Sequence, residues 1–301
     1  MFLLVFSSYV NYVGFMKAFI HTLVALGVFI TLTSCNRDIT TPIEELSVID
    51  MVATHDFETD MPISRLAFVP NNVAPWLGRV ILLSEGGKLY STDIEGRDPK
   101  PVGSSVYTDI FGLKRDNAPG VFLAINADGG IEAFLEADDE GNFSQMIYSG
   151  ENLSAVMFCP DTTAPGNTVM VLSPDNYKTE LVFEIMDGRI GQSIKNQNAV
   201  KGDPENCRNS ISFPFILRDG LVLMLDPLNQ GDGYRINLND GLSIRGLTRA
   251  NLIATTTANY GGTYVDGLVA FGDAQEQRLV FISFDYLTRK LDEIEQTQPP
   301  Q

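Results

Sequence analysis

The sequence predicts an all-β protein, a β-propeller of five to six four-stranded blades whose ring is closed by the N-terminal strand of the domain. The first observation is an Ala-Pro pair that recurs at residues 74–75, 118–119 and 164–165, in steps of 44 and 46 residues. The second is the order after each pair: an apolar strand, a polar turn, a second strand and an Asp/Gly turn. A repeat of about 40 to 50 residues with about four strands is typical of a propeller blade. A β-sandwich or two small barrels are the alternative, but neither predicts the Ala-Pro spacing.

The propeller domain is expected to span residues 47–295, and five repeats are visible within it. Their strand pairs are expected at residues 79–83 and 88–93, 121–125 and 131–136, 168–172 and 181–185, 213–217 and 221–225, and 267–271 and 278–284. Short runs rich in β-branched and aromatic residues, separated by Gly, Asp and Asn, indicate β-hairpins. Residues 233–257 have room for a sixth repeat, and no convincing amphipathic helix interrupts the series. The repeat places Phe68 and Phe158 at equivalent buried positions. Strand 47–54 is expected to join the last blade, which leaves the ring without an exposed edge.

The N-terminus resembles a bacterial lipoprotein signal, in which a small residue precedes a cysteine that becomes lipidated. Leu32-Thr33-Ser34-Cys35 has this form and ends an apolar run that begins after Lys17. A cation, a short apolar stretch and a small-residue cleavage site, in that order, predict a signal peptide at residues 1–34. The true start is expected at Met16, because residues 1–15 carry no positive charge. A permanent membrane helix over this stretch is the alternative.

Cleavage would leave a lipidated Cys35 and a polar tether at residues 35–46, and the tail at residues 296–301 is expected to be disordered. Asn36 stands where the inner-membrane retention signal has Asp, so the expected location is the periplasmic side of the outer membrane in a bacterial cell envelope. The chain has a net charge of −17, and loss of residues 1–34 removes one lysine and no acid, which gives −18. So acidic a surface repels nucleic acid and anionic headgroups. The expected partners are therefore the membrane, through the lipid, and an envelope protein or a small molecule.

Residues 79–96 contain Gly-Gly-Lys-Leu-Tyr-Ser-Thr-Asp-Ile-Glu-Gly, which resembles an element of the bacterial β-propeller phytases. Later segments follow in a similar order, and Pro204-Glu205-Asn206-Cys207 stands where that family has Pro-Glu-Gly-Cys. The resemblance spans about residues 47–290 and implies the propeller fold and, for the family, calcium-dependent hydrolysis of phosphoric esters. Glu205 is the catalytic candidate that it carries over. The family's first-blade acids are replaced by Ser64-Arg65, and its paired glutamates by Phe215–Arg218.

Two acidic groups are candidate calcium sites, because oxygen ligands from loops suit this ion. They are Asp138, Asp139 and Glu140, and then Asp56, Glu58 and Asp60 beside His55. The alternative for both groups is an ordinary solvated turn. Zinc sites built from several His and Cys are excluded, because one histidine and two cysteines remain after the lipidated residue.

Cys159 and Cys207 are these two remaining cysteines, and the oxidising periplasm permits a disulfide between them. A disulfide requires Cα atoms closer than about 7 Å, and the residues are 48 positions apart, about one blade. Two buried free thiols are the alternative.

Two functional classes follow from these features. The first is a membrane-anchored envelope lipoprotein whose propeller is a ligand- or protein-binding module and lacks the calcium and phosphate site of the phytases. The second is an enzyme, either a phytase-like phosphoric ester hydrolase or a hydrolase or lactonase with a single metal ion. Carboxylates from several blades that converge on the axis would favour the enzyme.

Overall fold

The computed structural model describes residues 39, 41–71, 73–113, 120–149, 154–159, 168–186, 189–196, 201–205, 207, 214–225 and 233–297. The predicted signal peptide, Met16 and the lipidation site at Cys35 lie outside these residues. So do residues 298–301 of the predicted tail. No helix among the described residues is both long and apolar enough to cross a membrane.

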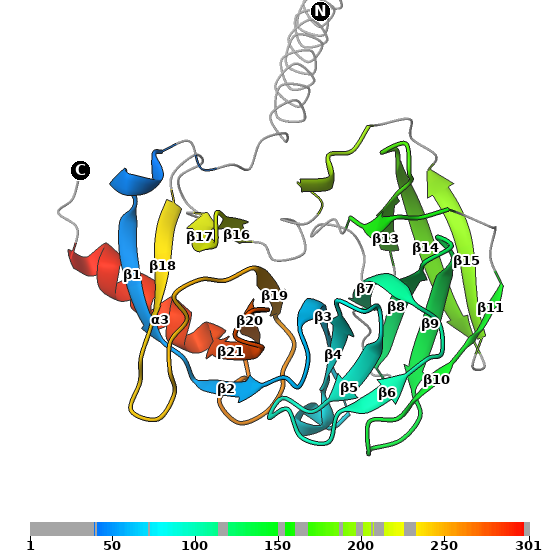
Figure 1. The fold of residues 1–301 in the computed structure, drawn as a ribbon, viewed down its shortest axis with the longest axis horizontal. Coiled ribbons are helices and arrows are strands. Elements are labelled where there is room, and N and C mark those ends of the chain that lie inside the picture. Colours follow the sequence, from blue (N-terminus) through cyan, green and yellow to red (C-terminus); the bar gives the residue numbers. More distant parts are fainter. Residues whose placement is uncertain are drawn as a thin grey trace, which may run out of the picture.

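The described residues form an all-β fold of five sheets with one α-helix at the C-terminus (Figure 1). We number the sheets in chain order. Sheet I contains β3 (Ile63–Val69), β4 (Arg79–Ser84), β5 (Leu89–Thr92) and β6 (Lys100–Val102). Sheet II contains β7 (Tyr107–Leu113), β8 (Val121–Asn126), β9 (Ile131–Glu136) and β10 (Phe143–Gln145). Sheet III contains β11 (Ile147–Ser149), β12 (Met157–Phe158), β13 (Thr168–Leu172), β14 (Lys178–Met186) and β15 (Arg189–Asn196).

The other two sheets each take in one strand from the N-terminal part of the domain. Sheet IV contains β16 (Phe215–Arg218), β17 (Leu221–Leu225), β18 (Gly233–Asn239) and β1 (Ser47–Val52). Sheet V contains β19 (Leu252–Thr256), β20 (Leu268–Asp273), β21 (Arg278–Ser283) and β2 (His55–Glu58). Two short 3-10 helices, η1 (Ile43–Glu45) and η2 (Pro75–Leu77), lie in the connections.

The predicted role of strand 47–54 is wrong in its detail. Residues 47–52 form β1, which pairs parallel with β18 in sheet IV and not with the last sheet. The strand that completes sheet V is β2, which pairs antiparallel with β21. The chain passes from one sheet to the next at Ala53–Thr54, where the amide of Thr54 donates to the carbonyl of Phe281 at 2.7 Å. One continuous N-terminal segment therefore adds an edge strand to two neighbouring sheets.

Apolar side chains bury both faces of the middle strands, which explains why these strands are continuous hydrophobic runs. Successive residues of a strand point to opposite faces. In β4, Val80 and Leu82 pack in the cluster shared with sheet V, whereas Ile81 and Leu83 pack in the cluster shared with sheet II. Similar clusters join sheets II and III, and sheets IV and V. Sheets IV, V, I, II and III therefore pack in that order, and Figure 1 shows them as an arc.

A single backbone contact repeats in all five sheets, at the β4–β5, β8–β9, β13–β14, β16–β17 and β20–β21 turns. The turn residue has a positive φ, and its carbonyl accepts a hydrogen bond from the segment that leads into the next repeat. These residues are Gly87 (φ 75°), Gly129 (83°), Asn176 (63°), Gly220 (81°) and Gln277 (51°). The donors are the amides of Tyr107 (2.9 Å), Ala155 (2.9 Å), Gly202 (2.6 Å), Ala250 (2.9 Å) and Thr59 (2.6 Å), respectively. Each repeat is thus bonded to its successor, and the last of the donors, Thr59, lies just before sheet I.

These turns also correct the predicted equivalence of Phe68 and Phe158. Both are buried on edge strands of their sheets, β3 and β12, with 6% and 0% exposure. However, Phe158 pairs with Val171, two residues before the turn that begins at Ser173. In sheet I the residue two before the turn is Leu82, whose partner is Leu66. Phe158 therefore corresponds to Leu66.

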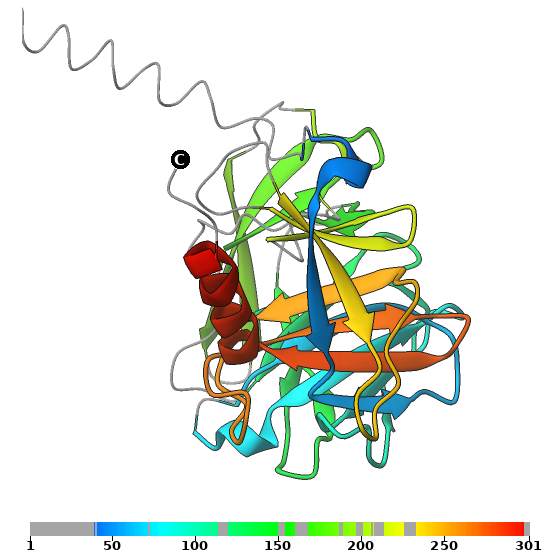
Figure 2. The same ribbon diagram turned by 90° about the vertical axis from the view of Figure 1, so that its left-hand side faces the viewer.

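Helix α3 (Phe284–Thr297) was not expected from the sequence, where residue 284 closed a predicted strand and residue 296 began a disordered tail. The side chain of Ser283 accepts a hydrogen bond from the amide of Tyr286 at 3.2 Å and so caps the helix. Apolar residues then recur at positions 284, 287, 291 and 294, which is helical spacing, and they pack on the cluster of sheets IV and V. Figure 2 shows the helix at the side of the molecule, beyond the end of β21.

The segment expected to be a free tether packs on the domain. Ile39 and Leu46 are buried, with 4% and 7% exposure, in a cluster with residues of β16 and β17. Ile39 also lies against the backbone of Gly233, where an added Cβ would come within 2.6 Å of its side chain. The ordered domain therefore begins several residues before β1.

Candidate functional site

The first predicted calcium group forms an ordinary turn between β9 and β10. The carboxylate of Asp138 accepts hydrogen bonds from the amides of Glu140 (3.0 Å) and Asn142 (3.1 Å) and from the side chain of Asn142 (2.7 Å). The Asn142 bonds are the main cause of a lowered pKa for Asp138. Lys100 lies 3.4 Å from the carboxylate of Glu140, and the carbonyl of Asp139 accepts a hydrogen bond from Arg79. The carboxylates of Asp138 and Glu140 are therefore already engaged within the turn and with Lys100.

The second predicted group is spread along β2 and the residue pair after it. Asp56 forms an ion pair with Arg278 at 3.2 Å, whereas Glu58 and Asp60 are exposed. His55 lies beside Phe281, with ring centroids 6.2 Å apart. Within the described ranges, no three His, Cys, Asp or Glu side chains are placed to hold a metal ion together.

Glu205 is exposed, and its amide donates to the carboxylate of Asp203 at 3.0 Å. It lies two residues before Cys207, which forms a disulfide with Cys159 across a Cα–Cα distance of 4.4 Å. Phe215 begins the segment Phe215–Arg218 that was expected in place of the phytase glutamates, and it is fully buried in the apolar cluster of sheets IV and V.

The sequence did not predict a buried polar contact that joins the edge strands β3, β7 and β12. Asp109 on β7 is 2% exposed, and its carboxylate accepts the amide of Phe158 on β12 at 2.8 Å. The Nε atom of Arg65 on β3 lies 3.5 Å from the other carboxylate oxygen. Both residues follow a β-bulge in their strands, so they occupy corresponding positions. The contact ties sheets I, II and III together, and no local sequence pattern announces it.

A hollow with measurable space lies at the junction of sheets IV and V. We call it the IV/V pocket, and its free volume is about 180 Å³. It is lined by residues from the β16–β17 turn, the segment before β19 and the β20–β21 turn, namely Leu217, Asp219, Gly220, Arg249, Ala250, Asn251, Asp273 and Gln275. The pocket lies where one of the five repeated turn bonds joins Gly220 to Ala250.

Hydrogen bonds join the three backbone segments that line this pocket. The amide of Asn251 donates to the carbonyl of Gly272 at 2.9 Å, and its side-chain oxygen accepts the amide of Ala274 at 3.1 Å. The carboxylate of Asp273 accepts the amide of Gln275 at 2.8 Å. The wall is therefore formed before any ligand arrives. Small-molecule sites are commonly preformed hollows at such junctions.

Two charged side chains of the IV/V pocket are available for a ligand. Arg249 and Asp219 are exposed, and neither forms a hydrogen bond or an ion pair with another residue of the described chain. Gly220 leaves room for the arginine, because a Cβ there would lie 2.8 Å from the Nε atom of Arg249. No sequence pattern pointed to this site, since Asp219-Gly220 is also an ordinary hairpin turn.

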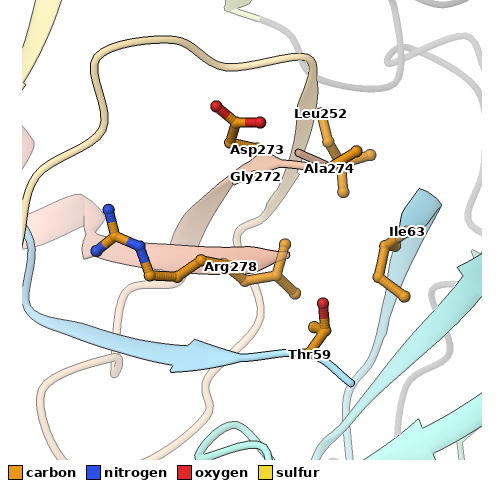
Figure 3. A pocket seen from close by; sticks show the side chains of 8 residues that line it. Thr59, Ile63, Leu252, Gly272, Asp273, Ala274 and Arg278 are labelled. Carbon is orange, nitrogen blue, oxygen red and sulfur yellow. The ribbon is translucent and has the colours of Figure 1, made fainter. Parts of the chain in front are cut away.

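A second hollow, at the junction of sheets V and I, is a closed seam (Figure 3). Thr59, Ile63, Leu252 and Leu279 are among its lining residues, and its free volume is about 0 Å³. Figure 3 shows the carboxylate of Asp273 turned away from Thr59 and Ile63. Asp273 therefore borders the seam while its carboxylate remains outside it.

Three large apolar side chains are exposed on the loops of sheets I and V. They are Val73, Trp76 and Val265, which are 77%, 72% and 54% exposed. The two loops touch, because Gly261 lies against the backbone and Cβ of Trp76. Trp76 is the single tryptophan of the chain.

No family model matches the chain, and no curated protein matches it. Solved structures that resemble it do so only distantly. Glutaminyl cyclase from Myxococcus xanthus is 13% identical with a TM-score of 0.38, over 79% of this chain and 97% of that one. The designed protein Ika4 is 14% identical with a TM-score of 0.29, over 62% and 97%. A chain in a Saccharomyces cerevisiae complex of Dbp5, Nup159 and Gle1 is 13% identical with a TM-score of 0.28, over 74% of this chain and 65% of that chain.

Proposed function

We propose that this protein is a lipid-anchored binding protein of the bacterial cell envelope, with a propeller domain that holds a small polar ligand. The IV/V pocket carries the proposal: it combines about 180 Å³ of space, a hydrogen-bonded frame and the unpaired side chains of Arg249 and Asp219. Charged side chains held ready in a preformed hollow are what a small polar ligand requires. The anchor is supported by the signal at Leu32 to Cys35.

The proposal includes a five-bladed ring. Five repeats of the same turn bond support the number of blades, and each bond leads from one repeat to the next. The bond from Thr59 to Gln277 supports closure, because it joins the last sheet to the segment that enters the first. Figure 1 shows β16 and β13 at the two ends of the arc, so in this proposal sheets III and IV are neighbours in the ring.

The binding function can be tested with full-length protein purified in detergent. Thermal unfolding is measured with a panel of small cationic, anionic, neutral and zwitterionic compounds. A ligand should raise the unfolding temperature of the wild type and have a much smaller effect on the variant Arg249→Gln/Asp219→Asn. If no compound stabilises the wild type selectively over this variant, the proposed function is wrong.

The sequence offers a matched control at a turn of sheet I. Arg97 is an exposed arginine, and Asp98 has φ 44°, close to the 54° of Asp219. The variant Arg97→Gln/Asp98→Asn therefore makes the same chemical change in a similar backbone conformation and should respond to the ligand as the wild type does.

The anchor is tested separately by metabolic labelling with a fatty acid. Cys35→Ala should abolish the label, and deletion of residues 1–15 should leave it unchanged. A label that survives Cys35→Ala would contradict the lipoprotein assignment.

A further inference from the structure

We infer that the ligand of the IV/V pocket is a small zwitterion with one ammonium and one carboxylate group, the class of the free α-amino acids. This inference rests on the proposed function, since it names the ligand of the same pocket. Three features of the pocket support it: the signs of the charges in its lining, its volume, and the hydrogen bonds that its side chains already form.

The charges of the lining favour a ligand that carries both signs. Arg249 supplies one guanidinium group, which matches a carboxylate in geometry and charge. Asp219 and Asp273 supply two carboxylates, which favour an ammonium group. Asp273 already uses one oxygen to accept the amides of Gln275 and Glu276. Asp219 has no such engagement within the described chain and is the better partner for an ammonium group.

The same charges disfavour three other ligand classes. A phosphate ester would bring about two negative charges near two carboxylates and a single cation. A divalent cation would meet the guanidinium of Arg249. A simple amine or a simple carboxylate would leave one of the two unpaired side chains, Arg249 or Asp219, without a partner. A zwitterion satisfies both side chains at once.

The volume of the pocket sets the size of the zwitterion. The free volume of about 180 Å³ is room for several water molecules. Pockets for drug-sized ligands begin at about 300 Å³. An amino acid with a short side chain fits this space, whereas a nucleotide or a disaccharide exceeds it.

Isothermal titration calorimetry on the full-length protein in detergent tests the inference. Glycine, alanine and serine are compared with acetate and propionate, which lack the ammonium, and with ethylamine, which lacks the carboxylate. At least one amino acid should bind, and both sets of truncated analogues should bind about tenfold more weakly or worse, since a hydrogen bond to a charged group is worth about 1.5 kcal/mol or more. Inorganic phosphate should show no heat of binding.

Single variants assign the two ends of the ligand. Arg249→Gln should weaken binding of the amino acid about tenfold but leave the weak binding of ethylamine unchanged. Asp219→Asn should also weaken binding of the amino acid about tenfold but leave the weak binding of acetate unchanged. Asn tolerates the positive φ of residue 219, so this variant should keep the wild-type unfolding temperature. Arg97→Gln and Asp98→Asn should bind as the wild type does.

The outcomes separate this inference from the proposed function. Equal affinity for an amino acid and its truncated analogues would overturn the inference, as would amino-acid binding that neither Arg249→Gln nor Asp219→Asn weakens. Selective binding of another class, sensitive to the same two variants, would overturn the zwitterion but keep the binding function. Absence of any variant-sensitive ligand would overturn both.

Discussion

The disulfide between Cys159 and Cys207 should contribute about 4 kcal/mol to the free energy of unfolding. It closes a loop of 48 residues, and the entropy lost by the unfolded chain on closing such a loop corresponds to about 4 kcal/mol at 25 °C. Residual structure in the unfolded chain would lower this value. Large apolar clusters join sheets I and II, II and III, IV and V, and V and I, whereas the described residues around this bond form a small cluster with Met157 and Leu172.

Urea unfolding of the oxidised wild type and of Cys159→Ala/Cys207→Ala, followed by circular dichroism, measures this contribution. The double variant should unfold at a clearly lower urea concentration. A reducing agent should lower the midpoint of the wild type but not that of the variant, which controls for effects of the reagent. Equal midpoints for the oxidised wild type and the variant would refute the reasoning, because the loop entropy would then contribute nothing.

Three further predictions concern packing, pH and activity. Gly112→Ala should lower the free energy of unfolding by about 3 kcal/mol, because the new Cβ would lie 2.1 Å from the carbonyl oxygen of Phe68; Gly86→Ala, whose Cβ meets nothing closer than 3.8 Å, is the control, and equal urea midpoints would contradict the close approach of β3 and β7. Burial raises the pKa of Glu136, so the folded state binds the proton of this carboxyl more tightly than the unfolded state does. The resulting stabilisation of the fold is complete below the unfolded pKa of about 4.3 and is lost as pH rises through the folded pKa. Glu136→Gln should remove this loss, and a urea midpoint with the same pH profile as the wild type would argue against it. We also expect no calcium-stimulated release of phosphate from phytate, and turnover that Glu205→Gln abolishes would show that the chain is an active phytase.

The sequence predicted the class of the fold because each repeat contains an apolar run followed by a polar turn, and both are visible in a short stretch of sequence. Val80 to Leu83 is an uninterrupted apolar run, and it is a middle strand with both faces buried. The turn that follows begins with Ser84, whose hydroxyl accepts the amide of Lys88, so its residue types match its geometry. Such features need no knowledge of distant neighbours.

What the sequence could not predict depends on contacts between segments far apart in the chain. Phe284 continues an apolar strand by its residue type, but in the structure it starts a helix that Ser283 caps and that packs on the cluster of sheets IV and V. Val48 and Met51 lie in a strand that the sequence predicts, but its pairing partner β18 is almost 190 residues away in the sequence and cannot be identified from local residue types. The IV/V pocket is assembled from residues about 50 positions apart, and its Arg249 lies in no motif.

The packing of Ile39 on sheet IV sets how closely the proposed lipid anchor would hold the domain. Three residues lie between Cys35 and Ile39, which makes four Cα–Cα steps, and a fully extended chain spans at most about 3.6 Å per residue. The link from the proposed lipid to the domain would therefore be no longer than about 14 Å, about half the hydrocarbon thickness of a bilayer. If Cys35 is lipidated as proposed, the domain meets only what diffuses to, or is fixed at, the membrane surface that holds the lipid.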